Sequence, residues 1–414
     1  MISVHEAQQR ILAHFQPVEI EVCPLDLACG RVLAAGISAT RDLPPFDNSS
    51  VDGFAVRSAD LAPASVSSWS LRVVADIRAG VYSDTPLQPG ECARIMTGAP
   101  LPPNSDAVVM VEDTDFTDRN PGTPAPAKVS IHRPVKPGEN LRRRGDDLRQ
   151  GERVLEAGTR LRAQEIGLLA MLGLAQVTVY RKPRLALLSS GDELLPLDAP
   201  LAPGKIHDAN THTLSALARG SGVEVISLGV AADTEADIRS RLGRAVDERA
   251  DVIVASAGVS VGAFDYVKSV LESDGELDFW RVNMRPGKPL AFGKYGGVPF
   301  FGLPGNPVSA FVGFEVFVRP ALERLSGIGA ERSHSVRPRP VWKVRLAEAI
   351  ESDGRESYLR AVVTEEGGRL TARLTGHQGS GNIFSLVRAN ALLIVPSGVK
   401  CVPADSEIDA WLLE

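Results

Sequence analysis

Two apolar runs in the second half of the chain each lead into a glycine-rich segment that opens a predicted helix. The first segment spans residues 251–265 and the second spans residues 299–309. Glycine has no Cβ, so the backbone N–H groups of such a segment can approach an anion, and the first turn of the following helix adds unpaired N–H donors. Two segments of this kind in one region predict an anionic, nucleotide-like ligand.

Each segment also has an interpretation that needs no ligand. Asn306 followed by Pro307 is a common pair of N-cap and first helical residue, so the second segment could be only a strand-to-helix turn. The first segment contains two glycines, Gly258 and Gly262, which is more than a strand-to-helix turn requires. That excess favours anion binding there.

Carboxylates follow the same predicted strands. Asp265 stands where the helix after the first glycine segment begins, and an N-cap is its simplest role. If residues 258–262 hold phosphate, this carboxylate is placed to bind a Mg²⁺ ion that bridges phosphate oxygens. The segment Ser190–Glu193, at the end of another predicted strand, adds two carboxylates. Together these groups predict metal-assisted phosphoryl chemistry.

Basic residues lie near these segments. Surface lysines such as Lys268 are usually solvated and indicate little on their own. Lys288 differs because Gly287 and Pro289 hold it in a short, stiff loop that can aim one ammonium group at an anion. The charged segment 142–147 is either solvated or functional, and its spacing does not decide between the two.

Composition narrows the class of protein. A chain of 414 residues exceeds one core of usual size, so we expect two to four domains. Lys and Arg number 45 against 51 Asp and Glu, without a basic block, so we expect neither nucleic acid nor a membrane as partner. The four cysteines form no CxxC pair, and neither a zinc site nor a disulfide is expected. We find no signal pattern and no apolar span of roughly 18 residues, which predicts a cytoplasmic protein.

The region from residue 180 to 326 alternates predicted strands and helices. Strands are expected at 185–189, 223–229, 252–256 and 299–302, with helices at 211–219, 235–246, after Asp265 and at 307–325. This alternation predicts a mostly parallel sheet covered on both faces. Ligands of such sheets bind beyond the carboxyl ends of the strands, where both glycine segments fall.

The flanking regions have other patterns. A capping box of Ser3 and Glu6 predicts an N-terminal amphipathic helix, and helical spacing returns at residues 160–174. We expect these two helices to pack together around an inserted β domain. The predicted domains are 1–48 with 140–178 (elongated and helical), 49–139 (small β domain), 179–327 (three-layer α/β) and 328–414 (β-barrel-like).

Several motifs, read in order, resemble the molybdopterin molybdenumtransferase (MoeA-type) family, to which the gephyrin E-domain belongs. Any one of them is weak, but together they extend over nearly the whole chain. The matching segments are Asp47–Val56, Arg94–Pro100, Asp106–Met110, Arg143–Asp147, Ser190–Leu194, Gly258–Gly262 with Asp265, Arg285–Pro289 and Gly302–Ser309.

The resemblance implies a fold and an activity. The fold is a central molybdopterin-binding α/β domain with an inserted β domain, an N-terminal helical or extended segment and a C-terminal β-barrel-like domain. The activity is the insertion of molybdate into adenylylated molybdopterin, with cleavage of the adenylyl group in the presence of Mg²⁺ and release of AMP. The family forms homodimers whose active site is shared between subunits. Further partners by resemblance are the adenylyltransferase and the molybdoenzymes that accept the cofactor.

The resemblance also implies roles for individual residues. Glu193 and Asp265 would bind or orient the metal and the attacking oxygen, and Asp52, Thr97 and Asp147 match positions important for activity. Lys288, Ser309, Arg360 and Ser380 would receive the oxyanion. The remaining substrate-binding positions are Ser190, Gly191, Asp192, Gly258, Ser260, Gly262, Lys268, Arg285, Pro304, Gly305 and Asn306.

The chain departs from the family pattern at a few positions. Ala257 stands where a second glycine is usual, Ser190 where threonine is common, and Arg285 where lysine is common. At each of these positions, the residue has roughly the size or the charge of the residue that is usual in the family. The last domain matches more loosely, and the sequence leaves open whether Arg355 or Arg360 contacts the oxyanion. Two other activities stay open: adenylylation of molybdopterin, and a non-catalytic scaffold like the gephyrin E-domain.

Overall fold

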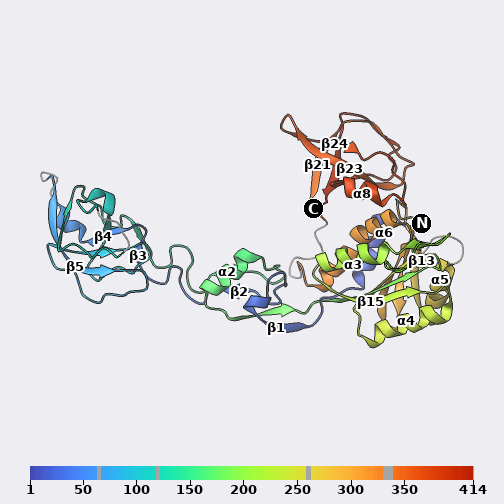
Figure 1. Cartoon of the computed structure of the whole chain (residues 1–414), viewed down its shortest axis with the longest axis horizontal. Coiled ribbons are helices and arrows are strands. Elements are labelled where there is room, and N and C mark those ends of the chain that lie inside the picture. The colour runs from blue at the N-terminus through green and yellow to red at the C-terminus, as the bar shows by residue number, and fades with distance from the viewer. Residues whose placement is uncertain (63–66, 118–121, 258–262, 330–338, 414) are drawn as a thin grey trace. The chain divides into compact units, whose positions relative to one another are not determined.

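The computed structural model describes residues 1–62, 67–117, 122–257, 263–329 and 339–413. The chain forms two compact units. The first comprises Met1–Ala35, Ala157–Ile166 and Gln176–Glu414, and the second comprises Gly36–Glu156 and Gly167–Ala175. The second unit is therefore inserted into the first in sequence: the chain enters it after Ala35 and has left it by Gln176 (Figure 1, blue to green).

A six-stranded sheet forms the centre of the first unit. Its strand order is β15 (Glu224–Ala231), β12 (Arg184–Ser190), β16 (Val252–Ala257), β20 (Val298–Pro304), β19 (Pro289–Tyr295) and β17 (Gly275–Arg281). The first four strands are parallel, whereas β19 and β17 run antiparallel at one side. The predicted parallel strands are confirmed. The carboxyl ends of β12, β15, β16 and β20 meet at one edge of the sheet.

Helices cover both faces of this sheet, as the predicted three-layer fold requires. Helices α3 (Asn210–Gly220) and α6 (Pro307–Gly313) lie on one face, and α4 (Glu235–Asp247) and α5 (Ala263–Asp274) on the other (Figure 1). Successive residues of a strand point to opposite faces. Accordingly, Leu187 of β12 packs in the core beneath α3, and Leu188 packs beneath α4.

The predicted helix from residue 307 to 325 is interrupted. It consists of α6, a π-helical segment from Phe314 to Val318, and α7 (Arg319–Leu325). The π-helical segment contains Glu315, which is buried. The Glu315 carboxylate accepts hydrogen bonds from Arg319 at 2.7 and 2.6 Å and from Arg339 at 2.7 Å. Helical periodicity alone does not show such a widened turn.

Helix α1 (Val4–Ala13) begins as predicted but packs elsewhere. Its N-cap Ser3 accepts a hydrogen bond from the backbone N–H of Glu6 at 3.1 Å, which confirms half of the capping box. Its apolar residues join the core of the α/β sheet, and α1 contacts α7 and the π-helical segment. We predicted packing against the helix after the insertion, and that expectation is corrected. That helix, α2, spans Ala163–Met171.

The C-terminal part of the first unit is a closed β-barrel. Strands β23 (Glu356–Glu366), β24 (Arg369–Leu374), β21 (Val341–Leu346), β27 (Glu407–Leu412) and β25 (Ala391–Val395) pair in that order, and β25 pairs back to β23. A hairpin turn joins β23 and β24 through Gly367 and Gly368, both with positive φ. The barrel packs on the α/β core through Tyr358 and Trp411. The predicted barrel-like domain is confirmed.

The second unit contains the inserted β structure. Its five-stranded sheet has the order β7 (Ala107–Met110), β4 (Gly53–Val56), β6 (Glu91–Ile95), β5 (Trp69–Ile77) and β8 (Lys128–Ile131). The chain segments before and after this sheet pair with each other as short antiparallel strands. The pairs are β2 (Ile37–Ser38) with β10 (Arg153–Leu155), and β3 (Asn48–Ser49) with β9 (Leu141–Arg142).

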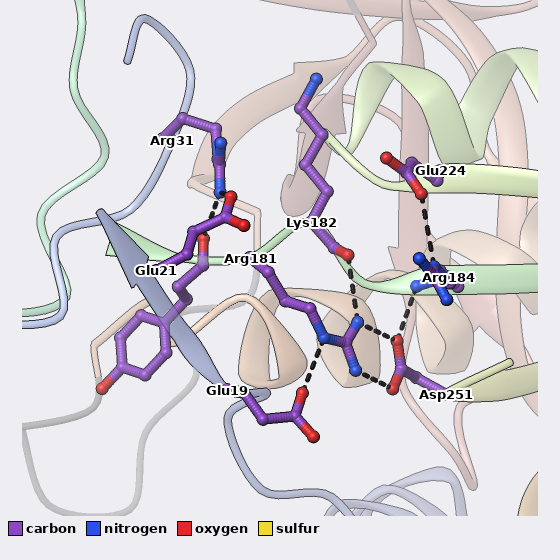
Figure 2. A network of polar contacts seen from close by, with 9 residues as sticks. Glu19, Glu21, Arg31, Arg181, Lys182, Arg184, Glu224 and Asp251 are labelled. Carbon is purple, nitrogen blue, oxygen red and sulfur yellow. Dashed lines mark hydrogen bonds and ion pairs between the residues drawn. The ribbon is translucent and has the colours of Figure 1, made fainter. Parts of the chain in front are cut away.

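A charged network anchors a two-stranded ribbon to the α/β sheet (Figure 2). The ribbon pairs β1 (Ile20–Pro24) with β11 (Gln176–Tyr180). Arg181 donates to Glu19 at 2.6 Å and, through both terminal nitrogens, to Asp251 at 2.7 and 2.6 Å. Asp251 also accepts the backbone N–H of Arg184 at 2.7 Å. These bonds raise the pKa of Arg181, with Asp251 the largest cause, so the guanidinium stays charged.

Candidate active site

The carboxyl end of β12 carries the first group of predicted site residues. The strand lies between β15 and β16, so its apolar residues are buried and it ends at Ser190, which is 3% exposed. The Ser190 Oγ atom is buried and has no hydrogen-bond partner among the described residues. Gly191 follows with φ +150°, and a Cβ there would lie 2.6 Å from Glu193 Oε2. Glycine therefore lets the chain turn while the Glu193 carboxylate folds back toward the strand end.

A second carboxylate at this edge comes from the neighbouring strand. Asp233 lies two residues beyond β15, and its backbone N–H donates to Asp192 Oδ1 at 3.3 Å. The backbone N–H of Asp192 donates in return to Asp233 Oδ2 at 3.4 Å. The other oxygen of Asp233 is buried without a partner in the described chain. Burial raises the pKa of Asp233, and the charges of Asp192 and Glu193 add to the effect.

Asp233 was absent from our sequence-based site. The signal that could have identified it is its place directly after a parallel strand, the same signal that identified Ser190–Glu193. Among the described residues, no three His, Cys, Asp or Glu side chains are placed to hold a metal ion by themselves. Gly258, Ser260 and Gly262 lie outside the described residues, as does the side chain of Asp265.

The second glycine segment follows β20 as predicted. Asn306 is at the N-cap of α6 and Pro307 at its first turn, but the Asn306 side chain makes no capping hydrogen bond. Ser309 is 4% exposed. The Asn210 side chain, from the start of α3, donates to Gly305 O and to Ser256 Oγ, both at 2.7 Å. One amide therefore connects the ends of β16 and β20.

A buried guanidinium group lies where the barrel meets the α/β domain. Arg360 of β23 is 0% exposed; its Nε donates to Ser385 Oγ at 2.9 Å and its Nη2 to Gly379 O at 3.0 Å. Its Nη1 atom is buried without a partner among the described residues. Burial, and next the charge of Arg285, lower the pKa of Arg360 to about 10. A buried cation with a second cation nearby and one unused donor is arranged for an anion.

Two other predicted site residues are connected to Arg360. Ser380 follows a residue that Arg360 contacts, and Arg285 lies on a strand that pairs with the strand of Arg360. Ser380 follows Gly379, and its carbonyl accepts the backbone N–H of Val308 at 3.0 Å, which ties it to the segment after β20. Arg285 lies in β18 (Met284–Arg285), which pairs with β23. Lys288 is exposed in the loop between β18 and β19.

Two predicted residues make contacts of a different kind. Arg355 donates to Asp353 and is held at the surface, so of the two candidate arginines only Arg360 has an unused buried donor among the described residues. Lys268 of α5 forms an ion pair with Glu272 at 3.4 Å, one turn along the same helix.

The second unit holds its own group of predicted residues. The backbone N–H and the Oγ1 of Thr97 donate to Asp52 Oδ1 at 2.7 and 2.8 Å. Both residues line a cavity of about 770 Å³. Asp147, on the returning chain, forms a half-exposed ion pair with Arg142 and does not line that cavity.

The fold and these residues define a multidomain protein of molybdenum cofactor biosynthesis. Residues 2–173 match the MoeA N-terminal region (domain I and II), residues 186–324 the probable molybdopterin binding domain, and residues 343–413 the MoeA C-terminal region (domain IV). The chain belongs to the molybdopterin molybdenumtransferase (MoeA) family, an enzyme family.

Individual relatives agree with this assignment. The molybdopterin molybdenumtransferase of Nostoc sp. is 38% identical over 398 residues, which cover 94% of this chain and 88% of that protein. Molybdopterin molybdenumtransferase 2 of Mycobacterium tuberculosis is 36% identical, with 99% of each chain covered. The crystal structure of the MoeA protein of Pyrococcus horikoshii superposes with a TM-score of 0.80 at 29% identity and covers 100% of both chains. None of the helices within the described ranges is long and apolar enough to cross a membrane.

Proposed function

We propose that this chain inserts molybdate into adenylylated molybdopterin, with Mg²⁺-dependent hydrolysis of the adenylyl phosphoanhydride and release of AMP. The observation that carries the proposal is the buried Arg360 guanidinium. Its Nη1 has no partner in the described chain, although burying a cation without full compensation is costly. Molybdate, a dianion that accepts hydrogen bonds on every oxygen, would supply the missing charge and the missing acceptor.

The proposed oxyanion site gathers donors from three segments. Arg360 would donate through Nη1, Ser309 and Ser380 would donate through their hydroxyls, and Lys288 and Arg285 would add positive charge at the open side. Ser385 Oγ and Gly379 O fix the Arg360 plane before the anion arrives. Such preorganised donors lose little free energy to reorganisation when an oxyanion binds.

The proposed hydrolytic site lies at the carboxyl end of the parallel strands. The phosphates would be held by residues 258–262 and by Pro304, Gly305 and Asn306, with Ser190 Oγ as a further donor and Gly191 giving room for close approach. Water adds to the phosphorus atom of the adenylyl group while the bridging P–O bond breaks, which gives AMP and leaves the terminal phosphate on the molybdopterin that has received molybdate. Glu193 would orient the attacking water and accept its proton.

The residues at this edge fit Mg²⁺ in their chemistry. Hard carboxylate oxygens suit this ion, and Mg²⁺ commonly uses only one or two carboxylates and completes its shell with water and substrate phosphates. Asp233, crowded by Asp192 and Glu193, has its pKa raised by burial and by those charges, a cost that a cation would offset. Glu193 and Asp265 would hold the ion, with Asp233 beside them. When bound, Mg²⁺ would neutralise the charge that develops on the phosphate oxygens.

We further propose that the enzyme is a cytoplasmic homodimer and that a partner subunit completes its active site. Asp52, Thr97 and Asp147 would contribute to catalysis from the inserted unit. Partner proteins would be the adenylyltransferase that supplies the substrate and the molybdoenzymes that accept the product. These statements rest on the family resemblance alone.

The decisive experiment is an AMP-release assay with purified protein, adenylylated molybdopterin, molybdate and Mg²⁺. We expect molybdate-dependent AMP release, a loss of about 100-fold or more in Glu193→Gln and Asp265→Ala, and unchanged release in Glu248→Gln, an exposed carboxylate just beyond α4. ATP consumption with bare molybdopterin would instead indicate an adenylyltransferase. Full cofactor synthesis by Asp265→Ala would show that this carboxylate is not required, and no AMP release by the wild type would favour a non-catalytic scaffold.

A further inference from the structure

The cavity in the inserted unit is large enough for a ring system. Its volume of about 770 Å³ falls within the range of small-molecule sites. Its lining includes the exposed pair Asp52 and Thr97 and, deeper, the buried Phe54 and Arg94. Every lining residue belongs to the second unit, so the cavity does not depend on how the two units are arranged.

The charges around this cavity disfavour a phosphate group. Arg94 is 6% exposed and forms a two-pronged ion pair with Asp76, with Nε to Oδ1 at 2.8 Å and Nη2 to Oδ2 at 2.6 Å. Arg78, at 63% exposure, lies 3.7 Å from the same carboxylate. The exposed rim of the cavity also carries the Asp52 carboxylate. Among the described lining residues, both guanidinium groups already face the Asp76 carboxylate, and the charge of Asp52 would repel an anion.

The walls instead suit a flat aromatic ligand. Phe116 packs edge-to-face on Phe54, with ring centroids 6.0 Å apart and planes at 84°, and the Arg94 guanidinium lies 5.7 Å from the Phe116 centroid. Met96 and Met110 complete this lining. Aromatic rings, guanidinium planes and thioethers all pack favourably on a planar ring.

The rim offers a hydrogen-bond acceptor for such a ring. Both hydrogen bonds that Asp52 accepts from described residues, the N–H and Oγ1 bonds of Thr97, reach Oδ1. They fix the carboxylate and leave Oδ2 to accept from an incoming ligand. A carboxylate held in this way recognises an amino or ring N–H group, as purines and pterins carry.

We propose that this cavity binds a planar, nitrogen-rich bicyclic ring, with Phe116 as stacking surface and Asp52 as acceptor. The inference rests on the proposed function, because adenylylated molybdopterin has two such rings, adenine and pterin, on either side of its phosphates. The cavity would take one of these two rings. It would thus act in substrate selection as well as in catalysis.

Two phosphate-free probes show whether the cavity binds the adenine ring or the pterin ring. Adenosine and 6-hydroxymethylpterin are titrated into the full-length protein by calorimetry. We expect one of them to bind and Phe116→Leu to weaken that binding by about tenfold, which is the worth of one aromatic stacking contact. Leucine keeps the apolar packing against Phe54. Asp52→Asn removes the acceptor charge without changing packing and is expected to weaken the same probe.

A matched control uses another phenylalanine whose ring lies close to a guanidinium group. Arg388 lies 4.7 Å from the Phe384 ring in the C-terminal part of the first unit, so Phe384→Leu makes the same change elsewhere and should leave binding unchanged. The inference is overturned if neither probe binds at millimolar concentration, or if binding survives both Phe116→Leu and Asp52→Asn. Wild-type AMP release is measured in parallel: release without ring binding overturns this inference alone, and ring binding without release overturns the proposed function alone.

Discussion

Asn210 donates a hydrogen bond to Ser256 across the carboxyl ends of the parallel strands, with 2.7 Å between Nδ2 and Oγ. The second N–H of the same amide donates to Gly305 O, also at 2.7 Å. Ser256 lies in the β16 part of the first glycine segment, and Gly305 lies in the second segment. Neither contact touches a predicted ligand atom, so Asn210 is a positioning residue that holds the two segments in register.

Replacing Asn210 with aspartate should therefore impair substrate binding more than turnover. The carboxylate would face the Gly305 carbonyl without a proton to donate, a change that costs about 1–3 kcal/mol. We expect the KM for adenylylated molybdopterin to rise about tenfold with a smaller change in kcat. Asn390→Asp breaks a similar clamp in the barrel, where Nδ2 donates to Val363 O at 2.8 Å. That control should lower the melting temperature and leave KM unchanged; an equal KM change in both variants would contradict the assignment.

A second prediction concerns Arg360 as the oxyanion donor. Molybdate at 100 times its Kd should stabilise the wild-type protein by about 2.7 kcal/mol, visible as a higher melting temperature. Arg360→Lys keeps the charge but cannot reproduce the planar set of donors, so most of this shift should disappear. Arg355→Lys, at the residue just before β23 and bound to Asp353, should keep the shift. If the two variants behave in the opposite way, Arg355 is the oxyanion ligand.

The elements that depend on local sequence could be predicted. The Ser3 cap, the Gly367–Gly368 turn and the alternation of strands and helices from residue 185 onward all follow from neighbouring residues, and the structure contains them. The packing of α1 could not be predicted. An amphipathic helix shows that one face is buried, but not which surface covers it.

Site chemistry shows the same division. Residues at strand ends, such as Ser190–Glu193, were predicted because parallel strands bring their carboxyl ends together. The pairing of Asp192 with Asp233 was missed, because it depends on which strands become neighbours in the sheet. The unused donor of Arg360 is likewise invisible in the sequence, since it results from burial between the barrel and the α/β domain.

Asp233 should lower stability at neutral pH while it serves the site. The pKa of Asp233 in the folded protein is raised, chiefly by burial. Below the pKa of the unfolded chain, which is about 4, this group costs no stability. As the pH rises from there through the folded-state pKa, the folded protein loses stability. Asp233→Asn should therefore stabilise the protein at pH 7 by up to about 1 kcal/mol, and the gain should vanish below about pH 4. Thermal melting at several pH values measures this. Mg²⁺ should stabilise the wild type more than the variant; a pH-independent gain would contradict the burial of a charge.

Glu315 should have the opposite pH dependence. Burial alone would raise its pKa, but hydrogen bonds from Arg319 and Arg339 outweigh burial and hold the pKa below its ordinary value. Its contribution to stability is thus present above pH 5 and is lost as the pH falls through the folded pKa. Because the carboxylate is fully buried, Glu315→Gln removes the charge that Arg319 and Arg339 both face and should cost about 3 kcal/mol at pH 7. Glu224→Gln, which breaks the exposed pair with Arg184 at 3.5 Å, should cost less than about 0.5 kcal/mol. Urea unfolding of both variants at pH 7 and pH 4 compares them, and equal costs at pH 7 would show that the buried network contributes no more than a surface pair.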